Sequence, residues 1–338
     1  MTPLPPIKNY RHDHDMDRRQ LLTVAAGAGL WAVGLCARAQ SDFPTQAIKI
    51  VVPYSAGTGS DALARTVAQG ITDKTGKVVV VENRDGGGSL IGTMAVAKAV
   101  PDGHTLLIAA NPMVIVPAGQ SQPQYNPTRD FVPVAKVGVI PLVLATTKSL
   151  GFKTLGDLIA YAKANPGKLS VATNGEGGYP HLTFEDLRLK AGFSYLHVPY
   201  KGSVQVTNDV LSGQVQAGIL GMAPFAPHIR AGKMRLIAIS PPYKVPDWPE
   251  ATLAQDVVPG FSALGWFGYV APAGTPPDVV EKLNKGINAA IAQPAVTEKL
   301  QNLGLVVVNE SPQYFDKVLR ADFERYGQIV KAIGYQPQ

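Results

Sequence analysis

Cysteine is almost absent from this sequence of 338 residues: Cys36 is the only one, and it lies in an apolar N-terminal stretch. The chain beyond that stretch therefore can form no disulfide, thiolate metal site or cysteine nucleophile. Other catalytic signatures are also missing, since the sequence contains no G-x-S-x-G, no H-E-x-x-H and no carboxylate pair at a suggestive spacing. We expect a protein that is not an enzyme and needs no metal or cofactor.

Charge is low as well, at 17% of residues, with a net charge of +6. Residues 1–39 hold five basic and three acidic residues, so the rest of the chain carries +4. No cluster of Lys and Arg interleaved with aromatic residues occurs, which argues against nucleic acid as a partner. A mildly positive chain suits an anionic ligand, although whole-chain charge is weak evidence for one.

The N-terminus has the three parts of a secretory signal. Arg18-Arg19 precede an apolar stretch from Leu21 to Leu35, and Ala37-Arg38-Ala39 follows as a cleavage site before Gln40. The arginine pair resembles a twin-arginine signal, and the choice between that pathway and the general one stays open. We expect translation to start at Met16 and the mature protein to be periplasmic.

Two other interpretations of this segment are weaker. A membrane anchor needs roughly 20 apolar residues, and the stretch is shorter than that. A lipid anchor on Cys36 would require a small residue before it, where Leu35 stands.

Apolar runs and helical periodicities alternate along the chain. The first group predicts a parallel sheet with helices on both faces; its elements are strand 48–53, helix 61–71, strand 78–81, helix 89–99 and strand 105–109. A second group has the same alternation; its elements are helix 155–164, strand 169–173, helix 181–191, strand 196–198, helix 204–212, strand 215–220 and strand 235–240. Two helices, 278–292 and 312–333, flank a strand at 305–308 near the end.

No low-complexity linker separates the two groups, so we expect crossover strands, with candidates at 139–146 and 262–270. The predicted fold class is α/β, with two lobes, each a parallel-type sheet flanked by helices. Residues 1–39 form the signal, 40–142 and 266–338 the first lobe, and 143–265 the second. The ligand cleft would lie at the carboxyl ends of the strands.

The first candidate binding loop joins a strand to a helix and contains Tyr54, Ser55, Ala56, Thr58, Ser60 and Asp61. Glycines 57 and 59 allow close backbone approach, and the free N–H groups of a helix start attract anions such as a carboxylate. The alternative is a plain glycine-rich connection in which Ser60 or Asp61 caps the helix.

A dinucleotide site is the second alternative for this loop. Residues 57–62 fit G-x-G-x-x-A after a strand, and Glu82 ends the next strand. Asp61 would, however, place a negative charge where the pyrophosphate sits, and export leads away from free NAD.

The second candidate loop, 174–181, also joins a strand to a helix. Asn174, Gly175 and the loop N–H groups are the expected donors; His181 could donate to the ligand or simply lie in the first helical turn. In a third loop, Tyr200 is expected to shape the cleft wall, and Lys201 either pairs with an anion or is merely exposed.

Six sequence blocks resemble those of the Bug receptors, the substrate-binding proteins of tripartite tricarboxylate transporters. Residues 52–61 are similar to their VPFxxGGxxD, 82–89 to ENRPGAGG, and 197–202 reproduce HVPYKG. The other blocks, in the same order as in the family, are 91–107, 125–134 and 271–276.

This resemblance implies a periplasmic, two-lobed receptor of Venus-flytrap type that closes on a small organic acid. It implies a membrane transporter as partner, or a sensing role without one, and we expect a monomer. The two loops 54–61 and 174–181 would hold the carboxylate through backbone N–H groups and ordered water. Matching positions near the ligand are Ser55, Ala56, Thr58, Ser89, Asn174 and Gly175.

The sequence departs from the family pattern at several positions. Thr58 and Ser89 replace glycines and add hydroxyls, which suggests a role in ligand choice. We expect Thr58→Val to weaken binding and to leave stability nearly unchanged. The other departures, Asp85, His104 and Asn126, are expected to be structural.

Overall fold

A computed structural model describes residues 43–246 and 248–335. The predicted signal, including Arg18-Arg19, Cys36 and the cleavage site, lies outside these residues. From Gln46 onward the described residues belong to one compact unit. No helix in the described ranges is both long and apolar enough to cross a membrane.

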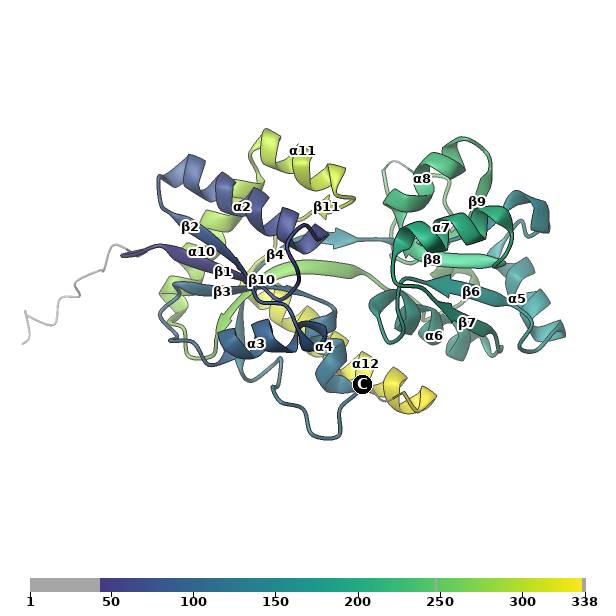
Figure 1. Cartoon of the computed structure of the whole chain (residues 1–338), viewed down its shortest axis with the longest axis horizontal. Coiled ribbons are helices and arrows are strands. Elements are labelled where there is room, and N and C mark those ends of the chain that lie inside the picture. Colours follow the sequence, from purple (N-terminus) through teal and green to yellow (C-terminus); the bar gives the residue numbers. More distant parts are fainter. Residues whose placement is uncertain (1–42, 247, 336–338) are drawn as a thin grey trace, which may run out of the picture. The chain divides into compact units, whose positions relative to one another are not determined.

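The first sheet has six strands in the order β11-β4-β10-β3-β1-β2 (Figure 1). Its parallel part contains β1 (Ile48–Val52) between β2 (Val79–Asn83) and β3 (Thr105–Ala110). Strand β10 (Gly265–Pro272) runs antiparallel to both β3 and β4 (Phe131–Ile140), and the short β11 (Val306–Val307) is antiparallel to β4. The parallel order predicted for the first group is confirmed, and the antiparallel strands come from segments far along the chain.

Helices connect and cover these strands. The first sheet's helices are α2 (Gly59–Thr75), α3 (Leu90–Ala97), α4 (Pro112–Ala118), α10 (Pro277–Ile291), α11 (Pro294–Asn302) and α12 (Pro312–Ile333). Apolar residues at helical spacing form one face of α2, and this face is buried, with Leu63 and Val67 fully inaccessible. Helix α2 ends at Gly76, which adopts the left-handed conformation that glycine tolerates best.

The second sheet has five strands in the order β7-β6-β8-β5-β9. Their bounds are β5 (Leu142–Thr147), β6 (Ser170–Thr173), β7 (Leu196–Pro199), β8 (Ala217–Gly221) and β9 (Met234–Ile239). Strand β6 is parallel to β7 and β8, whereas β5 is antiparallel to β8 and β9. The helices of this group are α5 (Leu155–Ala164), α6 (Tyr179–Ala191), α7 (Ser203–Ser212), α8 (Met222–Arg230) and α9 (Ala254–Val257).

The chain passes between the sheets at two neighbouring points. Strand β4 of the first sheet ends at Ile140, and β5 of the second begins at Leu142. On the return, Ser240 follows β9, exchanges hydrogen bonds with Leu142 and Ala263, and β10 then pairs with β4 from Gly265. Both points fall inside the segments predicted to cross, whereas the residue boundaries of the lobes stay a prediction.

Several elements were not predicted from the sequence, namely β4, α4, α8, α9 and α11. Prolines obscure two of them: α4 contains Pro112 and Pro117, and α8 contains Pro224 and Pro227. Proline suits the first turn of a helix, but its presence elsewhere normally indicates a break. Tertiary packing overrides that local signal here, since Val114 and Phe225 are both fully buried.

Helix α12 packs against β4 of the first sheet and also against α6, a helix of the second sheet. Leu182 of α6 lies in the same apolar cluster as Tyr326 and Ile329 of α12. Arg325 of α12 donates a hydrogen bond of 2.6 Å to Asp186 of α6, and Lys190 forms a second ion pair with that carboxylate. The two groups are therefore joined by side-chain contacts in addition to the two strand crossings.

Candidate functional site

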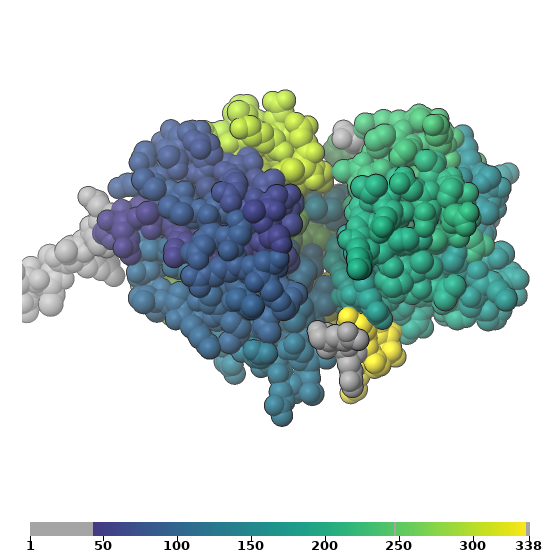
Figure 2. Space-filling model, viewed as in Figure 1, coloured from purple at the N-terminus to yellow at the C-terminus, as the bar shows by residue number. Residues whose placement is uncertain are grey.

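Three of the predicted loops contribute to one cavity of about 460 Å³. Tyr54 and Ser60 come from the first loop, Asn174 from the second, and Ser203 from the start of α7. In the space-filling view a hollow separates the purple-to-blue surface from the teal-to-green one on the visible face (Figure 2). The remaining lining residues are Ala110, Asn111, Pro112, Ile140, Leu142, Tyr179, Pro180, Gly221, Met222, Ala223, Pro224, Gly265, Trp266, Phe267, Leu303 and Gly304.

The starts of α2, α6, α7 and α8 all reach this cavity. Helices α6, α7 and α8 begin after glycines, with no side-chain cap and no acidic residue in the first turn. Their first N–H groups therefore keep the partial positive charge of a helix start. No Lys, Arg, His, Asp or Glu is among the cavity-lining residues of the described chain, so backbone N–H groups supply the positive potential there.

The start of α2 is different, because side chains of the same loop already bind its N–H groups. Thr58 is the N-cap: its hydroxyl donates to the Ser55 carbonyl at 3.0 Å and accepts from the Asp61 N–H at 3.4 Å. The assignment of Ser60 or Asp61 as the cap was therefore wrong. The neighbouring residue, Gly59, already belongs to the helix, which moves the cap two to three positions earlier than the sequence suggested.

Asp61 is buried beneath the same loop, at 5% exposure. Its carboxylate accepts from the Gly57 N–H at 2.9 Å, from Asn83 at 3.0 Å and from Arg65. Burial works to raise the pKa of Asp61, but the hydrogen bonds from Arg65, Gly57 and Asn83 hold it below its usual value. Asp61 thus shapes the loop and occupies its first free N–H group, which leaves that group unavailable to an outside anion.

Ser55 and Ala56, in the same loop, are exposed and do not line the 460 Å³ cavity. The Ser55 hydroxyl donates to the Asp85 carboxylate. Asp85, expected to be structural, thereby connects this loop to the glycine-rich segment that follows β2.

Ser89 has an unusual backbone, with φ at +90°, and it follows three glycines that also have positive φ. It is 2% exposed, and its hydroxyl has no hydrogen-bond partner among the described residues. Burial raises the pKa of Tyr54 to about 12, with a small opposing effect from Ser89. The structure therefore places Ser89 beside Tyr54 but not among the residues that line the cavity.

The second loop is held by its own histidine. His181, at 6% exposure, accepts a hydrogen bond from the Gly177 N–H through Nδ1 at 2.9 Å, and its Nε2 lies 3.7 Å from Glu185. Nδ1 is thus used by the loop and Nε2 faces a protein carboxylate, which supports the structural role for His181. Gly175, with φ at +156°, turns the loop so that its carbonyl accepts from Thr173 and Asn174 stays exposed.

Glu185 and His197 surround His181. Burial works to raise the pKa of Glu185, but the neighbouring His181 and hydrogen bonds from Arg188 and Tyr195 lower it to about 2. Burial, followed by the neighbouring His181, lowers the pKa of His197 to about 4, while Glu185 opposes the shift. At neutral pH this cluster therefore contains a carboxylate and a neutral His197.

The third loop does not place Tyr200 in the cavity. The Tyr200 hydroxyl donates to Asp209 at 2.6 Å, and burial together with that carboxylate raises its pKa to about 12. Lys201 is exposed. Ser203, two residues further on, is the member of this loop that lines the cavity.

The sequence alone did not point to Asn111 and Trp266 as lining residues. Asn111 Oδ1 accepts from the Trp266 N–H at 3.0 Å, and its Nδ2 donates to Asp322 at 3.3 Å. Trp266 Nε1 donates to the same carboxylate at 2.7 Å. Asn111 lies between a strand and a helix, at Ala110–Pro112, so the pattern that identified the other loops could have identified it as well. Trp266 reaches the cavity only because the chain returns to the first sheet just before it.

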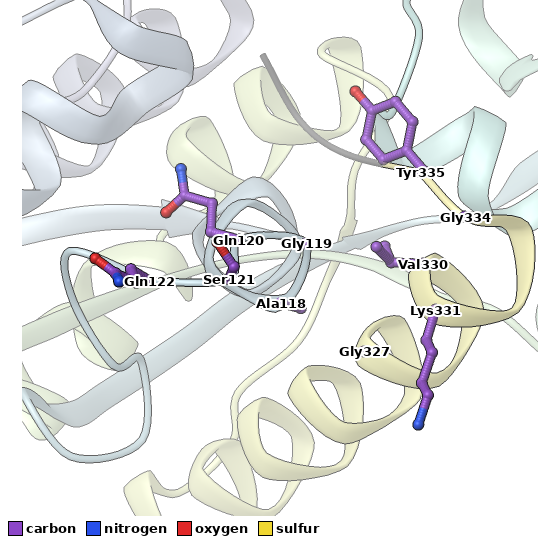
Figure 3. A pocket seen from close by; sticks show the side chains of 10 residues that line it. All are labelled: Ala118, Gly119, Gln120, Ser121, Gln122, Gly327, Val330, Lys331, Gly334 and Tyr335. Carbon is purple, nitrogen blue, oxygen red and sulfur yellow. The ribbon is translucent and has the colours of Figure 1, made fainter.

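Two larger cavities lie nearby. One, of about 1120 Å³, is lined by Tyr54, His181, Glu176, Glu185 and Arg188, among others. Another, of about 710 Å³, lies between the ends of α4 and α12 and contains none of the predicted residues (Figure 3). Two carboxylates in the first make it a poor place for an anion, and Lys331 in the second extends away from Gln120. The 460 Å³ cavity is the better candidate.

Within residues 43–246 and 248–335, no group of three or more His, Cys, Asp or Glu side chains could hold a metal ion. The dinucleotide interpretation is also disfavoured by contacts. Glu82, its proposed ribose ligand, forms ion pairs with Lys49 and Arg84, and Asp61 already uses the Gly57 N–H.

Two helix-flanked sheets, joined by two crossings and lining a common cavity, have the architecture of two-lobed periplasmic solute-binding proteins. The periplasmic binding protein BugD has this fold, with a TM-score of 0.70, 30% identity, and coverage of 88% of this chain and 100% of BugD.

The family model of the tripartite tricarboxylate transporter family receptor matches residues 63–335. BugT of Bordetella pertussis (strain Tohama I) is 35% identical over 323 residues, covering 94% of this chain and 99% of BugT. The chain belongs to this receptor family, as its motifs indicated.

Two similar structures contain ligands. R. palustris Rpa4515 with adipate has a TM-score of 0.71 and 31% identity, covering 88% of this chain and all of that one. MatC of Rhodopseudomonas palustris with bound malate has a TM-score of 0.69 and 28% identity, covering 85% of this chain and all of MatC.

Proposed function

We propose that this protein is a periplasmic receptor that captures a small organic carboxylate in the 460 Å³ cavity and delivers it to a tripartite transporter. It acts by binding rather than catalysis, as a monomer, and reaches the periplasm through its N-terminal signal. The observation that carries the proposal is the convergence of Ser60, Asn174 and Ser203, from three loops of two sheets, on one cavity.

The free polar groups of the cavity support an anionic ligand. No hydrogen bond among the described residues uses the side chains of Ser60, Asn174 or Ser203, so each can donate to a carboxylate. The open starts of α6, α7 and α8 add backbone N–H donors. The adipate and malate bound to the two related structures favour the same ligand class.

The mechanism we propose is closure of the two lobes about the crossings at Pro141 and Leu264. A ligand that contacts both sheets stabilises the closed state, because it gains contacts that the open state cannot offer. Tyr54 and the loop of Asn174 and Gly175 would then face each other across the ligand.

The first test is a thermal-shift screen of the chain from Gln40 against adipate, malate, benzoate and NAD. A ligand present at about 100 times its Kd adds roughly 2.7 kcal/mol, which raises Tm by several degrees. Stabilisation by at least one acid supports the receptor. Stabilisation by NAD alone contradicts the proposal. The proposal is also contradicted if the protein is stabilised neither by these acids nor by the six acids of the calorimetric test described below.

Asn174→Ala tests the site itself. We expect its Kd for the acid found in the screen to rise about tenfold, in line with loss of a hydrogen bond to a charged group. Asn208→Ala is the matched control, since Asn208 is also exposed but lies outside the cavity. Equal affinities of the two variants would remove Asn174 from the binding site.

A receptor that serves sensing without a transporter is the alternative role. Deletion of the gene distinguishes the two: loss of uptake of the labelled acid supports transport, and loss of a transcriptional response with normal uptake supports sensing.

A further inference from the structure

The 460 Å³ cavity has an apolar wall between its polar groups. Ile140 and Leu142 flank one crossing, and Trp266 and Phe267 follow the other. Met222, Pro224 and Leu303 add further hydrocarbon surface. A Cβ atom built on Gly221 would lie 3.2 Å from Ile140 Cγ2, so the Ile140 side chain extends toward the start of α8.

Two polar side chains in this wall, Asn111 and Trp266, are already occupied, and the Tyr179 hydroxyl, although without a partner among the described residues, is itself inaccessible. Asn111 is 3% exposed, and its amide oxygen and nitrogen bond to Trp266 and Asp322. The Trp266 indole N–H donates to the same Asp322 carboxylate. The open donors Ser60, Asn174 and Ser203 instead come from the three loops that join strands to helices, where a carboxylate is expected.

From this distribution we infer that the cavity selects carboxylates with a hydrocarbon body, aliphatic or aromatic, and rejects acids of the same length that carry hydroxyls on that body. The inference rests on the proposed carboxylate-binding function. A buried ligand hydroxyl against Ile140, Leu142 and Phe267 gives up its bonds to water and gains no partner, which weakens binding. A hydrocarbon body meets the same wall without that loss.

The test uses three matched pairs of acids in isothermal titration calorimetry with the mature protein. The pairs are adipate with galactarate, hexanoate with gluconate, and benzoate with 3,4,5-trihydroxybenzoate. Each pair has the same carbon skeleton and the same number of carboxylates, so the members differ in hydroxyls alone.

In every pair with measurable binding, we expect the hydrocarbon acid to bind at least tenfold more tightly than its hydroxylated partner. Equal or tighter binding of a hydroxylated acid overturns the inference while leaving the carboxylate receptor intact. Absence of binding by all six acids overturns the inference, and if malate also fails in the thermal-shift screen the proposed function is overturned with it.

Substitution of Ile140 provides a second, independent check. Ile140→Thr places a hydroxyl on the wall, and Ile140→Val has the same shape without it. We expect Ile140→Thr to reduce the preference for the hydrocarbon acid at least threefold relative to Ile140→Val, with similar Tm values. The same preference in both variants would contradict the assignment of selectivity to this wall.

Discussion

The imidazole rings of His181 and His197 stack face to face, with centroids 3.8 Å apart and planes within 3° of parallel. His181 belongs to α6 and His197 to β7, so the stack joins two elements beneath the loop of Asn174. Thr173 Oγ1 lies 2.7 Å from His197 Nε2. The charged and titratable groups around the pair include Glu185, Arg188, Tyr195 and Tyr335.

This stack predicts a loss of stability in mild acid. The pKa of His197 falls from about 6.5 in the unfolded chain to about 4 in the folded protein, because of burial and then of His181. Between these values the unfolded chain binds more protons, so the free energy of unfolding decreases as pH falls from about 6.5 to about 4. Partial exposure of the site screens the effect, and we expect about 1–2 kcal/mol from this residue. Urea unfolding at pH 7 and pH 4.5 measures the change.

His197→Gln should remove much of that pH dependence. His228→Gln is the control, because His228 lies on α8, away from the stack. If both variants keep the wild-type loss of stability between pH 7 and pH 4.5, the origin lies elsewhere.

Thr58 has a capping role that changes the expectation for its substitution. Its hydroxyl accepts from the Asp61 N–H at the start of α2. We now expect Thr58→Val to lower the free energy of unfolding by about 1 kcal/mol, and Thr58→Ser to leave it nearly unchanged. Denaturant titration of both variants tests this; unchanged stability of Thr58→Val would exclude the cap as a stabilising contact.

The ion pair of Arg325 and Asp186 joins α12 to α6. The Asp186 side chain is only 5% exposed, so removal of Arg325 leaves a buried carboxylate with Lys190 as its remaining cation. We expect Arg325→Leu to lower the free energy of unfolding by about 3 kcal/mol. Lys190→Gln, in which the lost ammonium is more exposed, should cost less than about 1 kcal/mol. Equal effects of the two substitutions in urea unfolding would contradict this ranking.

Two helical glycines differ in the space around them. A Cβ atom on Gly92 of α3 would lie 2.7 Å from the Arg84 carbonyl oxygen and 2.8 Å from Pro53 Cα, both backbone atoms. On Gly327 of α12 it would meet nothing within 4 Å. Gly92→Ala should therefore lower the free energy of unfolding by about 2 kcal/mol, and Gly327→Ala should raise it by up to about 1 kcal/mol. Tm measurements of both proteins check the opposite signs.

Much of the fold followed from local sequence patterns. The β-branched run at Ile48–Val52, the helical face of Leu63 and Val67, and the stop at Asn165–Gly167 each encode their element locally, because side-chain periodicity and chain-breaking residues act over a few positions. The two crossings were also predictable, since no linker separates the two groups of elements. Proline concealed α4 and α8, whose stability comes from burial.

The candidate site, like the fold, was predictable from the sequence only in part. The sequence by itself determined the glycine-rich loops after buried strands and the family motifs, and these led to Tyr54, Ser60 and Asn174. Only the tertiary structure decided that Thr58 and Asp61 serve the loop itself, that His181 bonds to its own loop and faces Glu185, and that Asn111, Ser203 and Trp266 line the cavity. The physical reason is that partners of a hydrogen bond or a cavity wall come from distant parts of the chain, and their meeting depends on how the two sheets pack and where the chain crosses between them.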